Sequence, residues 1–282
     1  MIKRLKNVKF KNPVMIEGLP GMGNVGKITI DFIIESLKAS KVFEISSFSF
    51  PNCIFVNNKG IAELPKVEIF HKAIKGKDLF LVSGDMQPVS EEGCYEFCDR
   101  LLDLFEEYKG KEIITLGGIG LEEMPKSPKV YCAGTNKKII AEYINQGIKD
   151  AEGVVGPVIG VSGLLVGLAK IRKMKAVVLL VETLGMPTYL GIKEARELIK
   201  VLNKQLKLGL NMKELNKEVK IIENEVNEKL RGFIAHEESK IKTKKEFTNY
   251  IGWVSEMTKA GWKWFCSKCG NISYGEGHSE SC

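Results

Sequence analysis

The chain has 282 residues, of which 44% are hydrophobic and 27% are charged, a balance that is ordinary for a soluble globular protein. Its net charge of +7 comes from lysines that are spread along the chain between acids, which argues against the concentrated basic stripe of a nucleic-acid-binding protein. No apolar run approaches the roughly 20 residues that cross a bilayer, and residues 1–11 lack the apolar segment of a signal peptide. We therefore expect a cytoplasmic protein without a membrane partner.

A glycine-rich turn lies between the first predicted strand, at residues 14–16, and the first predicted helix, at residues 28–37. The turn satisfies G-x-G-x-x-G and most of the P-loop pattern G-x-x-x-x-G-K-[ST]. Both patterns bring backbone amides and a helix N-terminus close to an anion. The candidate binding loop consists of Gly21, Gly23, Asn24, Gly26 and Lys27.

Neither pattern is complete in this loop. Ile28 follows Lys27 where a P-loop carries Ser or Thr to hold magnesium, and Glu44 is a poor match to the acid that a dinucleotide site places about 20 residues further on. The alternative is a structural one, in which the glycines make a tight turn and let the helix pack close to the sheet. We favour the structural turn and expect no bound nucleotide, and a phosphate site stays open as the alternative.

The next 180 residues alternate between apolar β-type runs and amphipathic helical runs. A set of short strands or hairpins is predicted within residues 42–70, followed by fully apolar strands at 78–85, 112–120 and 176–183 and a short strand at 130–133. Helices are predicted at 90–108, where Ser90 is the N-cap, and at 136–147, 162–172 and 193–206. Continuous apolar strands that are each followed by a helix predict an α/β domain, residues 1–210, with a mostly parallel sheet covered by helices on both faces.

Ligands of such sheets bind beyond the carboxyl ends of the strands. The loops predicted there are rich in Gly, Ser, Asp and Gln, so the candidate site also includes Asp85, Gln87, Gly117 and Gly118. None of the three histidines falls on these loops, and the sequence lacks a nucleophile elbow and the H-E-x-x-H pattern. We therefore assign no catalytic residues and favour a binding protein over an enzyme.

The C-terminal part of the chain has a different character. Residues 211–239 carry apolar residues at 3-4 spacing and predict a long amphipathic helix, which packs on its own domain or on a neighbouring subunit. Residues 240–282 are a linker and a cysteine-containing tail. The tail spacing C-x2-C-x8-H-x3-C suits tetrahedral zinc, with a disordered or redox-active tail and a site shared between subunits as alternatives. The candidate zinc ligands are Cys266, Cys269, His278 and Cys282.

Four motifs taken together resemble the archaeal proteasome assembly chaperone family, the homologues of the second eukaryotic assembly chaperone. They are Gly18-Leu19-Pro20-Gly21-Met22-Gly23-Asn24-Val25-Gly26, Ser83-Gly84-Asp85-Met86-Gln87-Pro88, Thr115-Leu116-Gly117-Gly118-Ile119 and Gly160-Val161-Ser162-Gly163-Leu164-Leu165. The resemblance covers about residues 12–233. It implies a three-layer α/β/α domain that forms homo-oligomers and binds proteasome α-subunits or core-particle intermediates without catalysis.

Two departures and two alternatives accompany this resemblance. Family members that dock on the core particle end in a hydrophobic-Tyr-X tail, whereas this chain ends in Glu280-Ser281-Cys282. The second departure is Met186-Pro187-Thr188-Tyr189, which stands where many relatives carry Pro-Asp. One alternative function is a phosphate- or nucleotide-handling enzyme that uses the Gly21 to Lys27 loop. The other, weaker one is nucleic-acid binding through the tail. The cysteine-rich tail itself is also not a feature of the family core.

Overall fold

The computed structural model describes residues 1–145, 147–186, 189–213 and 215, and the backbone of 253–258, 261–266 and 272–274. Contacts divide the chain into two compact units, Met1–Glu223 and Asn224–Cys282. None of the helices in the described part of the chain is both long enough and apolar enough to span a membrane.

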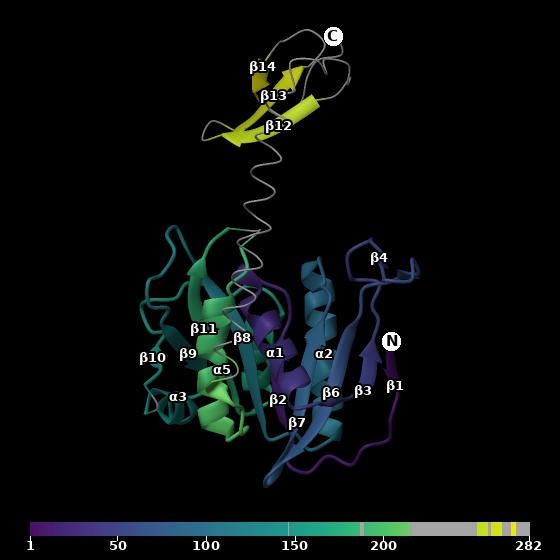
Figure 1. Cartoon of the computed structure of the whole chain (residues 1–282), viewed down its shortest axis with the longest axis vertical. Helices are drawn as coiled ribbons and strands as arrows, with labels where there is room; N and C mark the ends of the chain where they lie inside the picture. Colours follow the sequence, from purple (N-terminus) through teal and green to yellow (C-terminus); the bar gives the residue numbers. More distant parts are fainter. Residues whose placement is uncertain are drawn as a thin grey trace. The chain divides into compact units, whose positions relative to one another are not determined.

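The first unit is built on a nine-stranded mixed sheet (Figure 1). Across the sheet the strands are β1 (Ile2–Arg4), β3 (Ser40–Ile45), β6 (Val67–Ile74), β7 (Lys77–Gly84), β2 (Val14–Gly18), β8 (Glu112–Leu121), β11 (Ala176–Leu184), β9 (Val130–Gly134) and β10 (Lys149–Asp150). A separate hairpin pairs β4 (Phe55–Val56) with β5 (Ala62–Glu63).

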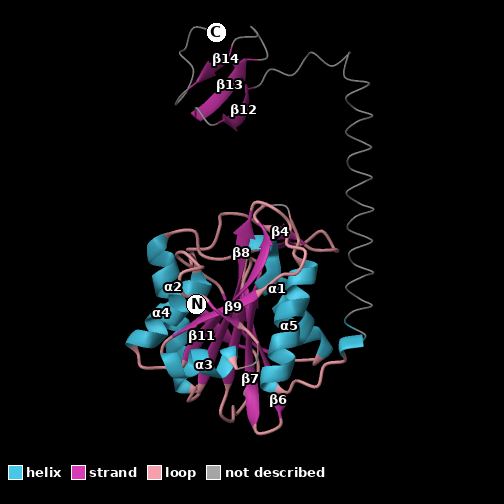
Figure 2. Ribbon diagram, turned by 90° about the vertical axis from the view of Figure 1, so that its left-hand side faces the viewer, coloured by secondary structure: helices cyan, strands magenta, loops and turns pink. Residues whose placement is uncertain are grey.

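Five α-helices cover both faces of this sheet, so the domain has three layers (Figure 2). One face is covered by α2 (Glu91–Glu107) and α4 (Val161–Ile171), and the other by α1 (Val25–Ser36), α5 (Ile192–Leu206) and α3 (Lys137–Ile144). The strands alternate their side chains between the two layers: Met15 packs with α2 and α4, whereas Val14 and Ile16 pack with α1 and α5. Both faces of the central strands are therefore buried.

The prediction of a mostly parallel sheet is correct for the four central strands, and the short edge strand β10 adds one more parallel pair with β9. Strands β7, β2, β8 and β11 pair in parallel, whereas β1, β3 and β6 form an antiparallel ladder that joins β7, and β9 is antiparallel to β11. Strands β6 and β7 are antiparallel because a two-residue turn, Lys75 and Gly76, connects them. So short a connection can join only antiparallel neighbours.

A second correction concerns the carboxyl edge of the sheet. The strands predicted at 112–120 and 176–183 are confirmed as β8 and β11, which stay paired as far as Leu121 and Leu184, so the candidate site residues Gly117 and Gly118 lie on a strand and not in a loop. The expected N-cap of α2 is confirmed, since Ser90 Oγ accepts a hydrogen bond from the Gly93 amide at 3.1 Å.

The second unit contains a three-stranded antiparallel sheet of β12 (Trp253–Thr258), β13 (Gly261–Cys266) and β14 (Ile272–Tyr274). The linker and cysteine-containing tail predicted for residues 240–282 do not include these strands. The long helix predicted at 211–239 lies, except for its first residues, outside the described part of the chain, and so do Cys269, His278 and Cys282. Cys266 ends β13, and only its backbone is described.

Candidate functional site

A cavity of about 360 Å³ lies at the carboxyl ends of β2 and β8, which are central strands of the sheet. Its walls come from the glycine turn, the end of β8, residues 155–159 and the start of α4. Open α/β sheets bind ligands at this edge, and the volume falls within the usual range for small-molecule sites. Polar side chains enter the wall at Gln87 and Ser162, and none of the described residues that line the cavity carries a charged side chain.

Backbone geometry explains two of the glycines in the turn. Gly23 has φ 61°, and a Cβ there would lie 2.5 Å from Thr183 Oγ1. At Gly26, on the first turn of α1, a Cβ would lie 2.8 Å from the Leu116 carbonyl oxygen of β8. These positions therefore need glycine because the helix and the sheet approach each other closely. Asn24 also has a positive φ, 51°, and its side chain does not cap α1.

The lysine of the P-loop-like pattern is held by neighbouring protein groups. Lys27 forms an ion pair with Asp31 one turn along α1, and its Nζ donates to Ser83 Oγ at 3.2 Å. Ser83 Oγ in turn donates to Asp31 Oδ1 at 2.6 Å. Lys27 is not among the residues that line the cavity. The Lys27 side chain is therefore not placed to hold an anion at the glycine turn. Phosphate binding by the turn stays the alternative left open by the sequence.

Gln87 joins two walls of the cavity. Its Nε2 donates to the carbonyl oxygen of Pro20 in the glycine turn, and its Oε1 accepts from the Val161 amide, at the first turn of α4, at 2.9 Å. Asp85 instead accepts from the Lys66 amide at 3.1 Å and is not among the cavity-lining residues. The structure therefore brings the predicted site residues Gly21, Gly26, Gln87, Gly117 and Gly118 to one cavity, without Asp85.

A buried carboxyl group lies behind this cavity, and sequence analysis does not select it. Glu17, the second-to-last residue of strand β2, is fully buried. Its Oε1 accepts from the Leu19 amide at 3.0 Å and its Oε2 from Ser162 Oγ at 2.9 Å. Burial raises the pKa of Glu17 from the ordinary 4.5 to about 7, while the hydrogen bonds from Ser162 and Leu19 lower it by less.

The hydroxyl of Ser162 couples this carboxyl group to the sheet. Ser162 Oγ also lies 3.1 Å from the carbonyl oxygen of Leu116, and a hydroxyl has one proton to donate. When Glu17 is ionised, Ser162 donates to it. When Glu17 is protonated, Glu17 can donate to Ser162 Oγ, and Ser162 can then donate to Leu116. The signal that could have revealed Glu17 is an acid within an otherwise apolar strand.

A model of the PAC2 family matches residues 15–230 of the chain, which include the glycine turn, the cavity walls and Glu17. The chain belongs to the PAC2 family. Among PAC2 relatives, the uncharacterized proteins MJ0106 and MJ1210 of Methanocaldococcus jannaschii are 31% and 28% identical to it. These alignments cover 86% and 82% of this chain and 95% and 88% of the relatives.

Solved structures agree with this assignment to PAC2. The crystal structure of Pyrococcus furiosus PbaB, described as an archaeal proteasome activator, is similar with a TM-score of 0.74 and 30% identity over 81% of this chain and 97% of PbaB. Pyrococcus furiosus PbaA, described as an archaeal homolog of proteasome-assembly chaperone, shares the fold with a TM-score of 0.69 and 22% identity over 88% of this chain and 99% of PbaA. The predicted resemblance to this family is thus confirmed.

Proposed function

We propose that this PAC2 protein binds proteasome α-subunits or core-particle intermediates as a homo-oligomer and does not catalyse a reaction. The observation that carries the proposal is the similarity to PbaB, which extends over nearly the whole of PbaB in sequence and in fold. The resulting function is that of an assembly chaperone or an activator, and both act by contact with other proteins.

The chemistry of the cavity supports a binding role. The described side chains that line it include no charged group, so its walls offer little for acid–base catalysis or for neutralising a phosphate. The nearest buried acid, Glu17, has both carboxylate oxygens engaged by protein donors. These features favour protein binding over the alternative of a phosphate- or nucleotide-handling enzyme built on residues 21–27.

Exposed apolar side chains around the cavity supply a contact surface, which we call the carboxyl rim. It comprises Met22, Met124, Ile159 and Met186, whose exposed fractions range from 44% to 91%. Met22 and Ile159 also line the cavity, and Gly120 brings β8 against the Met22 side chain. Methionine-rich surfaces adapt to varied apolar partners, which suits a protein that contacts assembly intermediates.

The test is binding of the full-length chain to purified α-subunits of the cognate proteasome, measured by interferometry. We expect binding that Ile159→Asp weakens at least about tenfold, because a charge would be buried in an apolar contact. Ile171→Asp is the matched control, since Ile171 is also exposed but lies at the C-terminal end of α4, away from the cavity. Absence of wild-type binding to α-subunits and core particles would overturn the proposal.

A further inference from the structure

A second apolar surface lies mainly on the segment that connects β3 to β6. It shares no residue with the carboxyl rim. We call it the hairpin patch, and it comprises Phe48, Ile54, Phe55, Val56, Ile61, Leu64 and Val89. Phe48 is as exposed as in an extended chain, at 102%, and Val89 and Leu64 are 74% and 70% exposed.

Contacts bring several members of this patch together. Phe48 and Leu64 line one groove of about 550 Å³. The Val89 amide donates to the carbonyl oxygen of Ser49 at 3.0 Å, which places Val89 beside Phe48. Pairing of β4 with β5 sets Val56 opposite Ala62, next to Ile61. Phe48, Leu64 and Val89 therefore lie together, and the β4–β5 hairpin, which leads directly into Leu64, adds exposed apolar side chains next to them in the chain.

The size of the hairpin patch matches an interface. A fully exposed large apolar residue presents on the order of 150–200 Å². With the exposed fractions found here, the seven residues together present on the order of 700–900 Å². Monomers rarely expose contiguous apolar patches above a few hundred Å², whereas a standard interface takes about 800 Å² from each partner.

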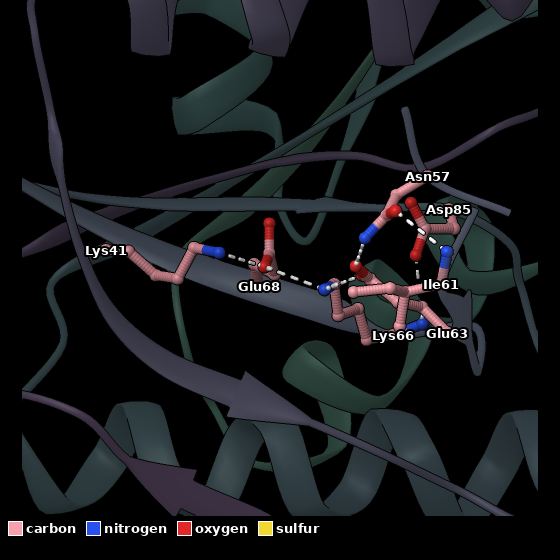
Figure 3. A network of polar contacts seen from close by, with 7 residues as sticks. All are labelled: Lys41, Asn57, Ile61, Glu63, Lys66, Glu68 and Asp85. Atoms are coloured by element: carbon pink, nitrogen blue, oxygen red, sulfur yellow. Dashed lines mark hydrogen bonds and ion pairs between the residues drawn. The ribbon is translucent and has the colours of Figure 1, made fainter. Parts of the chain in front are cut away.

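The hairpin that carries much of the patch is held in place by a polar network (Figure 3). Asn57 Oδ1 accepts from the Ile61 amide at 3.1 Å, and Asn57 Nδ2 donates to Glu63 Oε1 at 2.8 Å. Glu63 pairs with Lys66 at 2.9 Å, and the Lys66 amide donates to Asp85 Oδ2 on the loop after β7. The charged chain continues from Lys66 through Glu68 to Lys41 on β3. Because the hairpin is ordered before any contact forms, binding costs less conformational entropy.

The low net charge of the hairpin patch favours a second copy of this chain as its partner. Copies of a chain with a net charge of +7 repel one another, so a surface on which they meet must be poor in net charge. Residues 48–64 carry one lysine, Lys59, and one glutamate, Glu63, and Glu63 is already paired with Lys66. The groove beside Phe48 is also lined by Glu96 and by Met1 with its N-terminal ammonium, one charge of each sign. A neutral, apolar surface suits an isologous contact, in which the same patch serves both partners, and interfaces between identical chains are the more apolar ones.

We infer that the hairpin patch is the surface on which two copies of this chain meet, patch against patch. This inference rests on the self-association part of the proposed function and adds its location, on residues other than those of the helix predicted at 211–239. The carboxyl rim of each copy is left for the proteasome subunit.

The test is the subunit count of the full-length chain, measured by native mass spectrometry and by dilution in analytical ultracentrifugation. We expect a wild-type mass of at least two chains of 31.4 kDa. Phe48→Ser and Val56→Lys should each raise the dissociation constant at least about tenfold and lower the subunit count. Ile171→Ser, an exposed apolar residue outside the patch, should leave both unchanged. Circular dichroism checks that each variant keeps the wild-type fold, and both substituted side chains are already exposed.

The outcomes separate this inference from the proposed function. Folded patch variants that keep the wild-type subunit count would overturn the location of the contact while leaving self-association intact. A wild-type monomer at micromolar concentration would overturn self-association as well as the patch. Binding to α-subunits is measured in its own assay, so either result leaves the proteasome proposal to be judged separately.

Discussion

The buried carboxyl group of Glu17 makes the stability of the domain depend on pH in a direction opposite to that of most acids. Its pKa is raised from 4.5 to about 7 by burial. Between these two values the folded protein holds a proton on Glu17 that the unfolded chain has released. The free energy of unfolding therefore falls as the pH rises through this window, and above about pH 7 the Glu17 contribution is constant.

The magnitude follows from the width of the window. Each pH unit between 4.5 and about 7 corresponds to about 1.4 kcal/mol, so Glu17 lowers the stability by about 3 kcal/mol across it. This is a substantial part of the roughly 5–15 kcal/mol that stabilises a typical domain. Full burial means that solvent screening does not reduce the effect as it does at the surface.

Glu17→Gln isolates this contribution because glutamine does not titrate. Its amide can keep the hydrogen bond from the Leu19 amide and can donate to Ser162 Oγ, as the protonated acid does. We expect the variant to gain about 3 kcal/mol relative to wild type between pH 4.5 and pH 8. Ser162→Ala removes a bond that lowers the pKa of Glu17, so its pH-dependent loss should extend to higher pH.

The assay is urea unfolding at several pH values, followed by far-UV circular dichroism of the helices. Tryptophan fluorescence would report on the wrong unit, since the three tryptophans lie in the tail at positions 253, 262 and 264. The neighbouring thiol of Cys98 does not titrate in this window, because burial, followed by the charge of Glu17, raises its pKa. If wild type and Glu17→Gln lose stability in parallel from pH 4.5 to pH 8, the assignment of a raised pKa to Glu17 is refuted.

Three further outcomes are expected. Gly23→Ala should lower the free energy of unfolding in urea titrations by at least about 1–2 kcal/mol, because alanine would adopt a positive φ and place its Cβ against Thr183. An unchanged urea midpoint would contradict this geometry. Adding millimolar ATP should leave the melting temperature within about 1 °C of the apoprotein, since Lys27 is engaged by Asp31; a shift of several degrees that Lys27→Ala abolishes would instead establish the phosphate site. For the tail, elemental analysis should find one zinc per chain that is lost in Cys269→Ser, and a metal-free wild type would rule out the zinc prediction.

The sequence predicts the centre of this fold better than its edges. Strands β7, β8 and β11 are largely buried between the two helix layers. Their sequences are therefore continuous apolar runs, a pattern typical of central parallel strands. Strand β1 has three exposed residues, Ile2–Arg4, and looks like the start of a basic tail. Strand β10 has only two residues. Edge strands depend on pairing with distant segments, which leaves no periodic pattern in a single sequence.

The site was predictable in its backbone and not in its side-chain contacts. Turn glycines and the loop around Gln87 carry local signals, and Gly21, Gly26 and Gln87 do line the cavity. Glu17 is marked only as an acid within an apolar strand, and its contact could not be predicted, because the hydroxyl that binds it belongs to Ser162, 145 residues away in the chain. For Lys27 both the P-loop-like pattern and the actual partner are local in sequence. Its partner Asp31 lies four residues along the same helix, so this ion pair could have been predicted.

Long-range hydrogen bonds fix the glycine turn at several points, and this bears on how the carboxyl rim can be tested. Gln87 donates to the turn at Pro20, and the carbonyl oxygen of Gly23 accepts from the Gly191 amide at 2.8 Å. The turn therefore sets the position of Met22 without itself needing to touch a partner. Gln87→Leu should lower stability by about 1–3 kcal/mol, by leaving buried groups unpaired, and weaken α-subunit binding through the altered shape of the rim.

A rim substitution should behave differently from a turn substitution. Ile159→Asp changes a side chain that is 91% exposed, so it should weaken α-subunit binding while the urea midpoint stays the same. Gln87→Leu should change both quantities together. If Gln87→Leu destabilises the domain but binds α-subunits as wild type does, the turn does not shape the contact surface, and the rim must be placed elsewhere on the molecule.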